Sequence, residues 1–198
     1  GDGKAKRDRL RERFEERKDD QSYSMLFNEL VNQGFPAEAY ALFVGYKDAR
    51  LAAQDGNNQA VSLCLDQGDY RTPLDLTWQI ARFGHVWQRA SYLDRVATVF
   101  ADRGKAALLA ADLEAKSAAE TNRSRTFEAG IARVWAKAGH SEKALAIYDG
   151  LLRENPTDRG AIQAKAKLLV ELNRGDEAVR LLRNPAGIGD LEEEIAAS

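Results

Sequence analysis

The sequence predicts an all-α protein, an α-solenoid of stacked helix–turn–helix repeats. Three observations lead to this prediction. Apolar residues recur at helical spacing, a set of positions recurs every 34–35 residues, and the composition favours helices, with only four prolines. No part of the sequence shows the sustained alternation typical of a strand.

The stretch at 134–156, VWAKAGHSEKALAIYDGLLRENP, defines the hairpin. Trp135 lies one turn after Ala132, so both share a face of a first helix. Gly139 is expected to end that helix in a left-handed conformation, and Ser141 is expected to cap the next helix. The second helix carries one apolar stripe, made of Ala144, Ile147, Tyr148, Leu151 and Leu152. One hairpin cannot bury its own stripe, so further copies are expected.

Four positions of this hairpin recur in five copies along the chain. In the second helix, Ala144 corresponds to Ala39, Leu74, Leu109 and Ala178, and Tyr148 corresponds to Phe43, Trp78, Leu113 and Leu182. In the first helix, Trp135 corresponds to Leu30, Leu65, Phe100 and Leu169, and Ala132 corresponds to Phe27, Ser62, Ala97 and Ala166. Gly34 and Gly104 share the phase of Gly139, whereas Gly68 and Gly175 fall slightly off it.

The period divides the chain into a charged leader helix over 1–19, a solenoid over 20–190 and a short capping helix or frayed tail over 191–198. The five repeats cover 20–54, 55–89, 90–124, 125–158 and 159–190. Ten repeat helices are expected, at 21–33, 36–53, 57–68, 73–83, 87–102, 105–120, 123–138, 141–154, 158–173 and 175–184. If the tail is helical, Leu191 and Ile195 dock on the last repeat.

The hairpin resembles the tetratricopeptide repeat, which combines small and large residues at crossing points with a Gly at the turn and a closing Pro. The copy at 125–158 carries the pattern best, through Ala132, Trp135, Gly139, Ala144, Tyr148 and Pro156. The copies at 55–89 and 90–124 are degenerate, because Leu74 and Leu109 replace the small residue of the second helix. The resemblance implies a right-handed solenoid that binds other proteins.

Residues that carry catalytic chemistry are scarce, and we expect no enzyme, cofactor or metal site. His85 and His140 have no partner at ligand spacing, and Cys64 stands alone as an expected core residue. Asn122 lies in a formal glycosylation triplet but is interpreted as a helix N-cap. Trp87 is the tryptophan expected to be exposed, because Trp78 and Trp135 occupy core positions.

The charge balance argues against nucleic acid as a partner. The net charge is −2 and the isoelectric point is near 5.8, so no global field attracts phosphates. The leader helix carries dense charges of both signs and a sparse apolar edge of Leu10 and Phe14. It is interpreted as a solvated helix, or alternatively as a juxtamembrane helix behind an upstream anchor. Because the chain starts without Met, we expect a soluble part of a longer protein, whose remainder can include a membrane anchor.

A binding groove is expected on the first helices, which line the concave face of such a solenoid. One row contains Asn28, Leu63, Thr98, Arg133 and Lys167, and a second row contains Ser24, Gln59, Asp94, Ala129 and Gln163. The candidate groove residues are Asn28, Asp94, Thr98, Arg133, Lys137, Gln163 and Lys167. Such a polar surface suits an extended or helical peptide, and its cationic C-terminal end favours an acidic segment.

These observations lead to the expectation of a non-catalytic protein-interaction scaffold. A looser resemblance favours bacterial tetratricopeptide proteins that organise envelope, secretion or polysaccharide-export assemblies, which places the chain in the periplasm or envelope rather than the cytoplasm. Two alternatives remain open. The 35-residue period also resembles pentatricopeptide repeats that bind single-stranded RNA, and a degenerate repeat can serve self-assembly.

Overall fold

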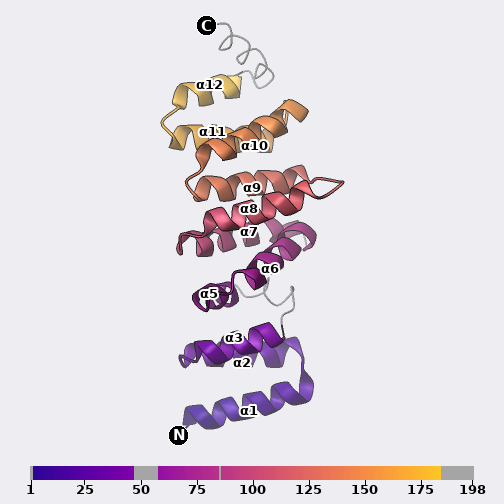
Figure 1. Ribbon diagram of the computed structural model, residues 1–198, viewed down its shortest axis with the longest axis vertical. Helices are drawn as coiled ribbons and strands as arrows, with labels where there is room; N and C mark the ends of the chain where they lie inside the picture. The colour runs from indigo at the N-terminus through magenta and orange to yellow at the C-terminus, as the bar shows by residue number, and fades with distance from the viewer. Residues whose placement is uncertain (1, 47–57, 85, 184–198) are drawn as a thin grey trace. The chain divides into compact units, whose positions relative to one another are not determined.

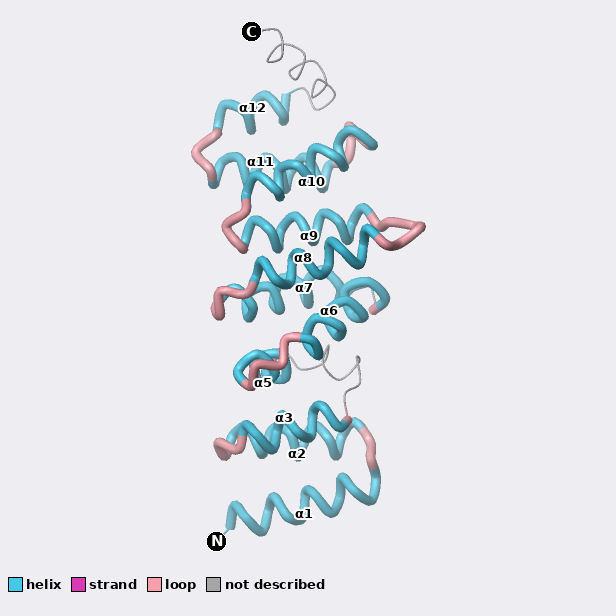
Figure 2. The backbone as a smooth tube through the Cα atoms, viewed as in Figure 1, coloured by secondary structure: helices cyan, strands magenta, loops and turns pink. Residues whose placement is uncertain are grey.

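The computed structural model describes residues 2–46, 58–84 and 86–183, and over these residues the chain is helical (Figure 1). The first helices in chain order are α1 (Asp2–Arg17), α2 (Asp20–Asn32), α3 (Pro36–Gly45), α5 (Gln59–Asp66), α6 (Arg71–Phe83) and α7 (Val86–Ala101). They are followed by α8 (Ala106–Ala118), α9 (Arg125–Lys137), α10 (Ser141–Glu154), α11 (Arg159–Glu171) and α12 (Gly175–Arg183). The described part of the chain contains no strand, which confirms the all-α prediction (Figure 2).

The chain divides into two compact units, Gly1–Val99 and Phe100–Ser198. In the first unit, α1 packs on α2, α2 on α3, α3 on α5, and α5 on α6. In the second unit, α8 packs on α9, α9 on α10, α10 on α11, and α11 on α12. Within each unit the helices therefore pack in sequence order, as stacked hairpins do.

A hydrogen-bonded turn ends each first helix and sets the repeat register. After α9, the N–H of Gly139 donates to the carbonyl of Ala136, and the N–H of His140 donates to the carbonyl of Trp135, each at 3.0 Å. This is the Schellman arrangement, which requires a left-handed residue at the turn. Such residues follow α2, α5, α7, α9 and α11, with positive φ at Gly34, Gly68, Gly104, Gly139 and Asn173.

The turns correct the predicted register at two places. Asn173, with φ of 61°, takes the left-handed position in the last repeat, and Gly175 instead begins α12. In the second repeat α5 ends one residue early, so Cys64 accepts the hydrogen bond that Trp135 accepts in α9. The equivalents of Trp135 and Ala132 are therefore Cys64 and Val61, which are buried, rather than Leu65 and Ser62.

Most predicted core positions are buried. The confirmed positions include Leu30, Ala39, Phe43, Leu74, Ala97, Phe100, Leu109, Leu113, Ala132, Trp135, Ala144, Tyr148, Ala166, Leu169 and Ala178. Ser62 and Ile147 are only half-buried, and two further predicted positions, Leu182 and Trp78, are not buried either. Leu182 is 55% exposed because α12 turns Leu181 inward instead. Trp78 is half-buried, while Thr77 is fully buried and satisfies its hydroxyl by donating to the carbonyl of Pro73 at 2.6 Å.

The leader helix is docked rather than merely solvated. Leu10 and Phe14 of α1 are buried, and the Phe14 ring meets the ring of Tyr46 edge-on at 5.2 Å. Lys6 forms an ion pair with Glu29 of α2 at 2.5 Å. Within the described residues, no helix has the length and apolar character needed to cross a membrane.

The remaining helix predictions differ from the structure mainly at their ends. The helix expected over 36–53 ends at Gly45, and its last seven predicted residues lie outside the described range. Ser141 is the first residue of α10 rather than its cap, and Ser124, not Asn122, caps α9 by accepting from the Phe127 N–H at 3.4 Å. The expected capping helix with Leu191 and Ile195 lies outside the described residues.

Gly139→Ala is expected to lower the free energy of unfolding by about 1–2 kcal/mol, because alanine is strained at a φ of 81°. A Cβ at this position meets nothing within 4 Å, so the cost is conformational rather than steric. Asn173→Gly is the matched change of opposite sign and is expected to be neutral or slightly stabilising. Urea denaturation measures both, and equal effects would contradict the assigned turn.

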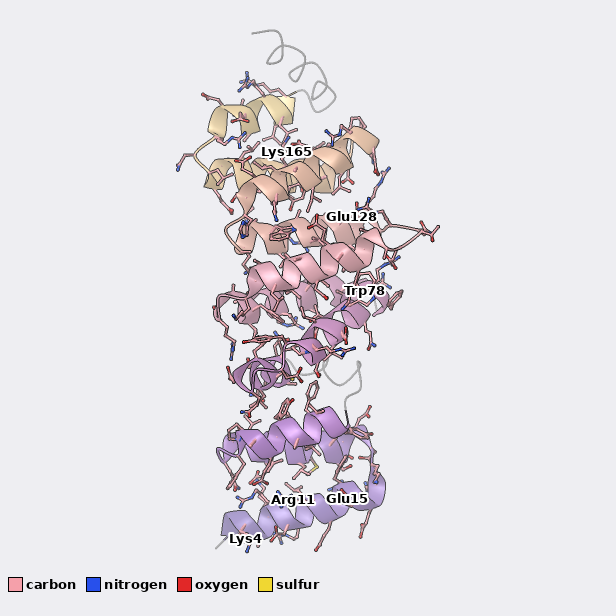
Figure 3. The ribbon with its side chains drawn as sticks, in the orientation of Figure 1. Lys4, Arg11, Glu15, Trp78, Glu128 and Lys165 are labelled. Carbon is pink, nitrogen blue, oxygen red and sulfur yellow. The ribbon has the colours of Figure 1, made fainter. Side chains whose placement is uncertain are left out.

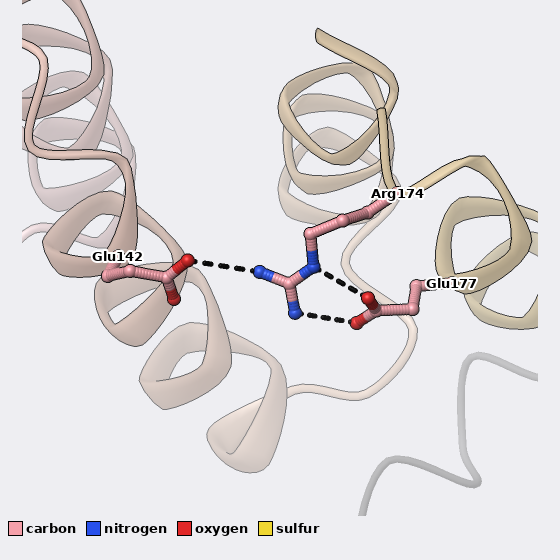
Figure 4. Close-up of polar contacts among 3 residues, drawn as sticks. All are labelled: Glu142, Arg174 and Glu177. Carbon is pink, nitrogen blue, oxygen red and sulfur yellow. Dashed lines mark hydrogen bonds and ion pairs between the residues drawn. The ribbon is translucent and has the colours of Figure 1, made fainter. Parts of the chain in front are cut away.

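Arg174 joins the last two hairpins through two carboxylates (Figure 4). Its guanidinium donates to both oxygens of Glu177 at 2.6 and 2.7 Å, and to Glu142 on α10 at 3.1 Å. The hydrogen bonds from Arg174 hold the pKa of Glu177 below its ordinary value of 4.5. A lowered pKa contributes stability that is present above about pH 4.5 and is lost as the pH falls through the folded-state pKa.

Glu177→Gln should therefore destabilise the chain near pH 7 and lose this effect as the pH falls through the lowered pKa of Glu177. The expected size is at most about 1 kcal/mol, because both side chains are more than a third exposed. Urea denaturation at pH 7, 4.5 and 3 measures the difference. Glu142→Gln, whose carboxylate is 82% exposed, is the control expected to show a smaller difference at pH 7.

Candidate binding surface

The turn register redefines the two rows of candidate groove residues. The first row, six residues before each left-handed turn residue, contains Asn28, Ser62, Thr98, Arg133 and Lys167. The second row, four residues earlier, contains Ser24, Asn58, Asp94, Ala129 and Gln163. The prediction of Leu63 and Gln59 in these rows is wrong because α5 ends one residue early. With Ser62 in place of Leu63, the first row is polar throughout.

The seven predicted groove residues lie on the surface, three in the first unit and four in the second. Asn28, Asp94, Thr98, Lys137, Gln163 and Lys167 are exposed, and Arg133 is half-buried. Asn28 on α2 and Asp94 and Thr98 on α7 belong to the first unit. Arg133 and Lys137 on α9 and Gln163 and Lys167 on α11 belong to the second unit. The second unit holds all three of the predicted cations.

Both row cations of the second unit make contacts within their own helices. Arg133 donates from Nη1 to the carbonyl of Ala129 at 3.4 Å, within its own helix. The Lys167 ammonium lies 3.9 Å from a carboxylate oxygen of Glu171, and these side chains are 79% and 58% exposed. An exposed ion pair at this distance contributes little, so the Lys167 ammonium is able to exchange Glu171 for another carboxylate.

The structure also contains a pocket that the sequence did not reveal, of about 150 Å³ between α8, α9 and α10. Three carboxylates line it, one from each helix: Glu114, Glu128 and Glu154. Its apolar wall is formed by Ile131, Ile147 and Leu151. We refer to it as the carboxylate pocket, and Glu128 marks its position in Figure 3.

Each carboxylate of this pocket is held by a neighbouring group. The indole N–H of Trp135 donates to Glu114 at 3.0 Å. Arg123, from the connection between α8 and α9, places its Nε 2.7 Å from a carboxylate oxygen of Glu128. The Nε of Arg125 lies 3.3 Å from Glu154. The pocket is thus an acidic site, and two of its three carboxylates already meet a guanidinium group of the chain itself, Arg123 at Glu128 and Arg125 at Glu154.

The remaining candidate residues form no site within the described structure. No cluster of three or more His, Cys, Asp or Glu side chains there is arranged to hold a metal ion. Cys64 is fully buried, as expected of a core residue. His140 is exposed and meets the Trp135 ring edge-on at 5.3 Å. His85 and the side chain of Trp87 lie outside the described part of the chain.

Comparison with models of protein families found no match for the chain, and comparison with curated proteins found none. The tetratricopeptide resemblance therefore remains an expectation from the residue pattern.

Proposed function

We propose that the chain is a non-catalytic protein-interaction scaffold whose first helices present the contact surface. One observation supports this most directly. Arg133 and Lys167 each lie six residues before the left-handed residue that ends their helix, in successive hairpins of one unit. Two cations are thus presented at equivalent positions of neighbouring repeats, which is a suitable arrangement for reading an extended segment.

The partner that best fits this surface is an acidic peptide segment. Lys137 lies one turn after Arg133 on α9 and is also exposed, which adds a third cation to the same set. The backbone that carries these side chains is already fixed in packed helices, so little conformational entropy is lost on binding. Each contact with a complementary carboxylate therefore contributes more to the free energy of binding.

We further propose that the chain serves a bacterial envelope, secretion or polysaccharide-export assembly. The support is the looser resemblance in composition and the charged helix α1. That helix uses part of its charge within the fold, because Lys6 pairs with Glu29 and Arg11 pairs with Glu38. Its cations are therefore weaker support for contact with a membrane than their number suggests.

A display selection with random peptides tests the scaffold proposal and does not require that the partner be identified first. Wild-type protein is expected to enrich peptides with two or more acidic residues, and Arg133→Glu with Lys167→Glu is expected to lose that enrichment. The matched control reverses Arg159 and Arg180, which are exposed on α11 and α12 outside the rows and give the same change in net charge. Equal enrichment by all three proteins would contradict the proposed surface.

Binding of single-stranded RNA is the alternative function, and the charges of the chain favour it less than peptide binding. A phosphate-binding groove needs an excess of cations, whereas Asp94 is exposed in the second row and the chain carries a net charge of −2. Fluorescence titration with single-stranded RNA at low salt is expected to show no tight binding. Tight and steeply salt-dependent binding would reverse the ranking of the two functions.

A further inference from the structure

We propose, building on the scaffold function above, that the carboxylate pocket binds an arginine side chain of a protein partner and that Arg123 occupies it in the free chain. The pocket combines Glu114, Glu128 and Glu154 with a single lining cation, Arg123. Arg125 pairs with Glu154 from outside the lining, so three carboxylates meet two cations and the site keeps an excess of one negative charge. Among the described residues Glu114 has no cationic partner, since its carboxylate is held by the neutral indole N–H of Trp135.

A buried hydroxyl provides a second, independent indication of a ligand. Ser117 lines the pocket, is 1% exposed, and has no hydrogen-bond partner for its Oγ within the described structure. Buried polar groups are nearly always paired, so an unpaired hydroxyl marks a place for an absent group. A guanidinium offers five N–H donors in a planar fork, enough to reach this oxygen and the carboxylates together.

The shape of the pocket suits an arginine rather than a small cation. Ile131, Ile147 and Leu151 form an apolar wall along which an aliphatic stem can pack while its charged end meets the carboxylates. Gly150 of α10 lines the pocket without a side chain, and a Cβ there would meet nothing within 4 Å. There is therefore room beside α10 for a side chain at this position.

Arg123 shows that the pocket accepts a guanidinium group, and it is the group that a partner arginine would replace. It approaches from the connection between α8 and α9, and its side chain remains 56% exposed while that of Glu128 is 14% exposed. Because more than half of the Arg123 side chain is already exposed, its guanidinium can return to solvent when a partner arginine takes its place beside Glu128. Only chains whose pocket is free of Arg123 can bind the partner arginine. The apparent affinity for the partner therefore falls in proportion to the fraction of chains in which the pocket is free.

The test is an NMR titration of the full chain with N-acetyl-arginine amide, observed at the indole N–H of Trp135, which contacts Glu114. Trp135→Phe assigns that signal among the three tryptophans. The signal is expected to shift and saturate at a dissociation constant on the order of 1–10 mM. N-acetyl-citrulline amide, a neutral isostere, is expected to leave it unchanged.

Two variants examine the occupant and the site. Arg123→Ala is expected to strengthen arginine binding about three- to tenfold by removing the competitor. Glu128→Gln is expected to weaken binding by about tenfold through loss of a carboxylate. A third variant, Gly150→Leu, is expected to fill the pocket and abolish binding, and it should fold, since leucine favours helices and its Cβ meets no neighbour.

Equal binding of N-acetyl-citrulline amide, or unchanged binding of N-acetyl-arginine amide by Gly150→Leu, would overturn the proposal of an arginine pocket. So would unchanged or weaker binding by Arg123→Ala with helicity intact. These outcomes are separate from those of the display selection. Enrichment of acidic peptides without arginine binding would contradict only the proposed arginine pocket. Arginine binding without that enrichment would contradict only the proposed peptide-binding surface.

Discussion

Trp135→Ala is expected to lower the free energy of unfolding by about 3–5 kcal/mol, because it removes a large side chain from a packed site. Trp135 is 4% exposed and lies on α9, whose neighbours α8 and α10 pack against it. Its ring meets the Lys143 ammonium at 4.1 Å, and its indole N–H donates to Glu114 at 3.0 Å. The change thus empties a core site and leaves Glu114 without its donor.

Trp135→Phe separates the loss of core packing from the loss of the hydrogen bond to Glu114. Phenylalanine keeps much of the apolar contact but cannot donate to Glu114, so a smaller loss of about 1–2 kcal/mol is expected. Urea denaturation of the three proteins measures the difference. A loss below about 1 kcal/mol for Trp135→Ala would mean that the repeat core is not centred on this residue.

The repeat period predicted the fold well because the same turn recurs with the same hydrogen bonds. Its failures have local physical causes. In the second repeat, α5 ends one residue early, and the buried face of α6 shifts by one residue with it, since Thr77 is fully buried where Trp78 was expected. In the last repeat the left-handed position is filled by Asn173, which a search for glycine overlooks although asparagine also adopts this conformation.

The candidate surface was only partly predictable. The row residues follow from helical phase, so the exposure of Lys137, Gln163 and Lys167 could be predicted from the sequence. The carboxylate pocket could not. Its acids come from three helices and share no period, and Arg123 reaches Glu128 from a connection between helices, where no repeat pattern fixes the side chain.

Reversing Arg133 and Lys167 to Glu is expected to weaken binding of an acidic peptide selected by display by about 2–5 kcal/mol if the contacts are desolvated. Arg133 is half-buried, so its contact with a partner carboxylate is the better shielded of the two. Neither residue belongs to the core, and circular dichroism should show unchanged helicity. Fluorescence anisotropy with the labelled peptide measures the affinity, and the reversal of Arg159 and Arg180 is the control.

The same contact can be tested by removing Glu171, the carboxylate that competes with the peptide for Lys167, and this change is expected to strengthen binding. Glu171 lies 3.9 Å from Lys167 and occupies the ammonium that the partner carboxylate needs. Glu171→Gln removes this competition and is expected to tighten peptide binding by up to about 1 kcal/mol. A general electrostatic attraction would give a similar gain for Glu154→Gln, since Glu154 is comparably exposed but pairs with Arg125. A gain confined to Glu171→Gln therefore assigns the contact to Lys167, whereas equal gains would show that only net charge matters and that the row has no specific role.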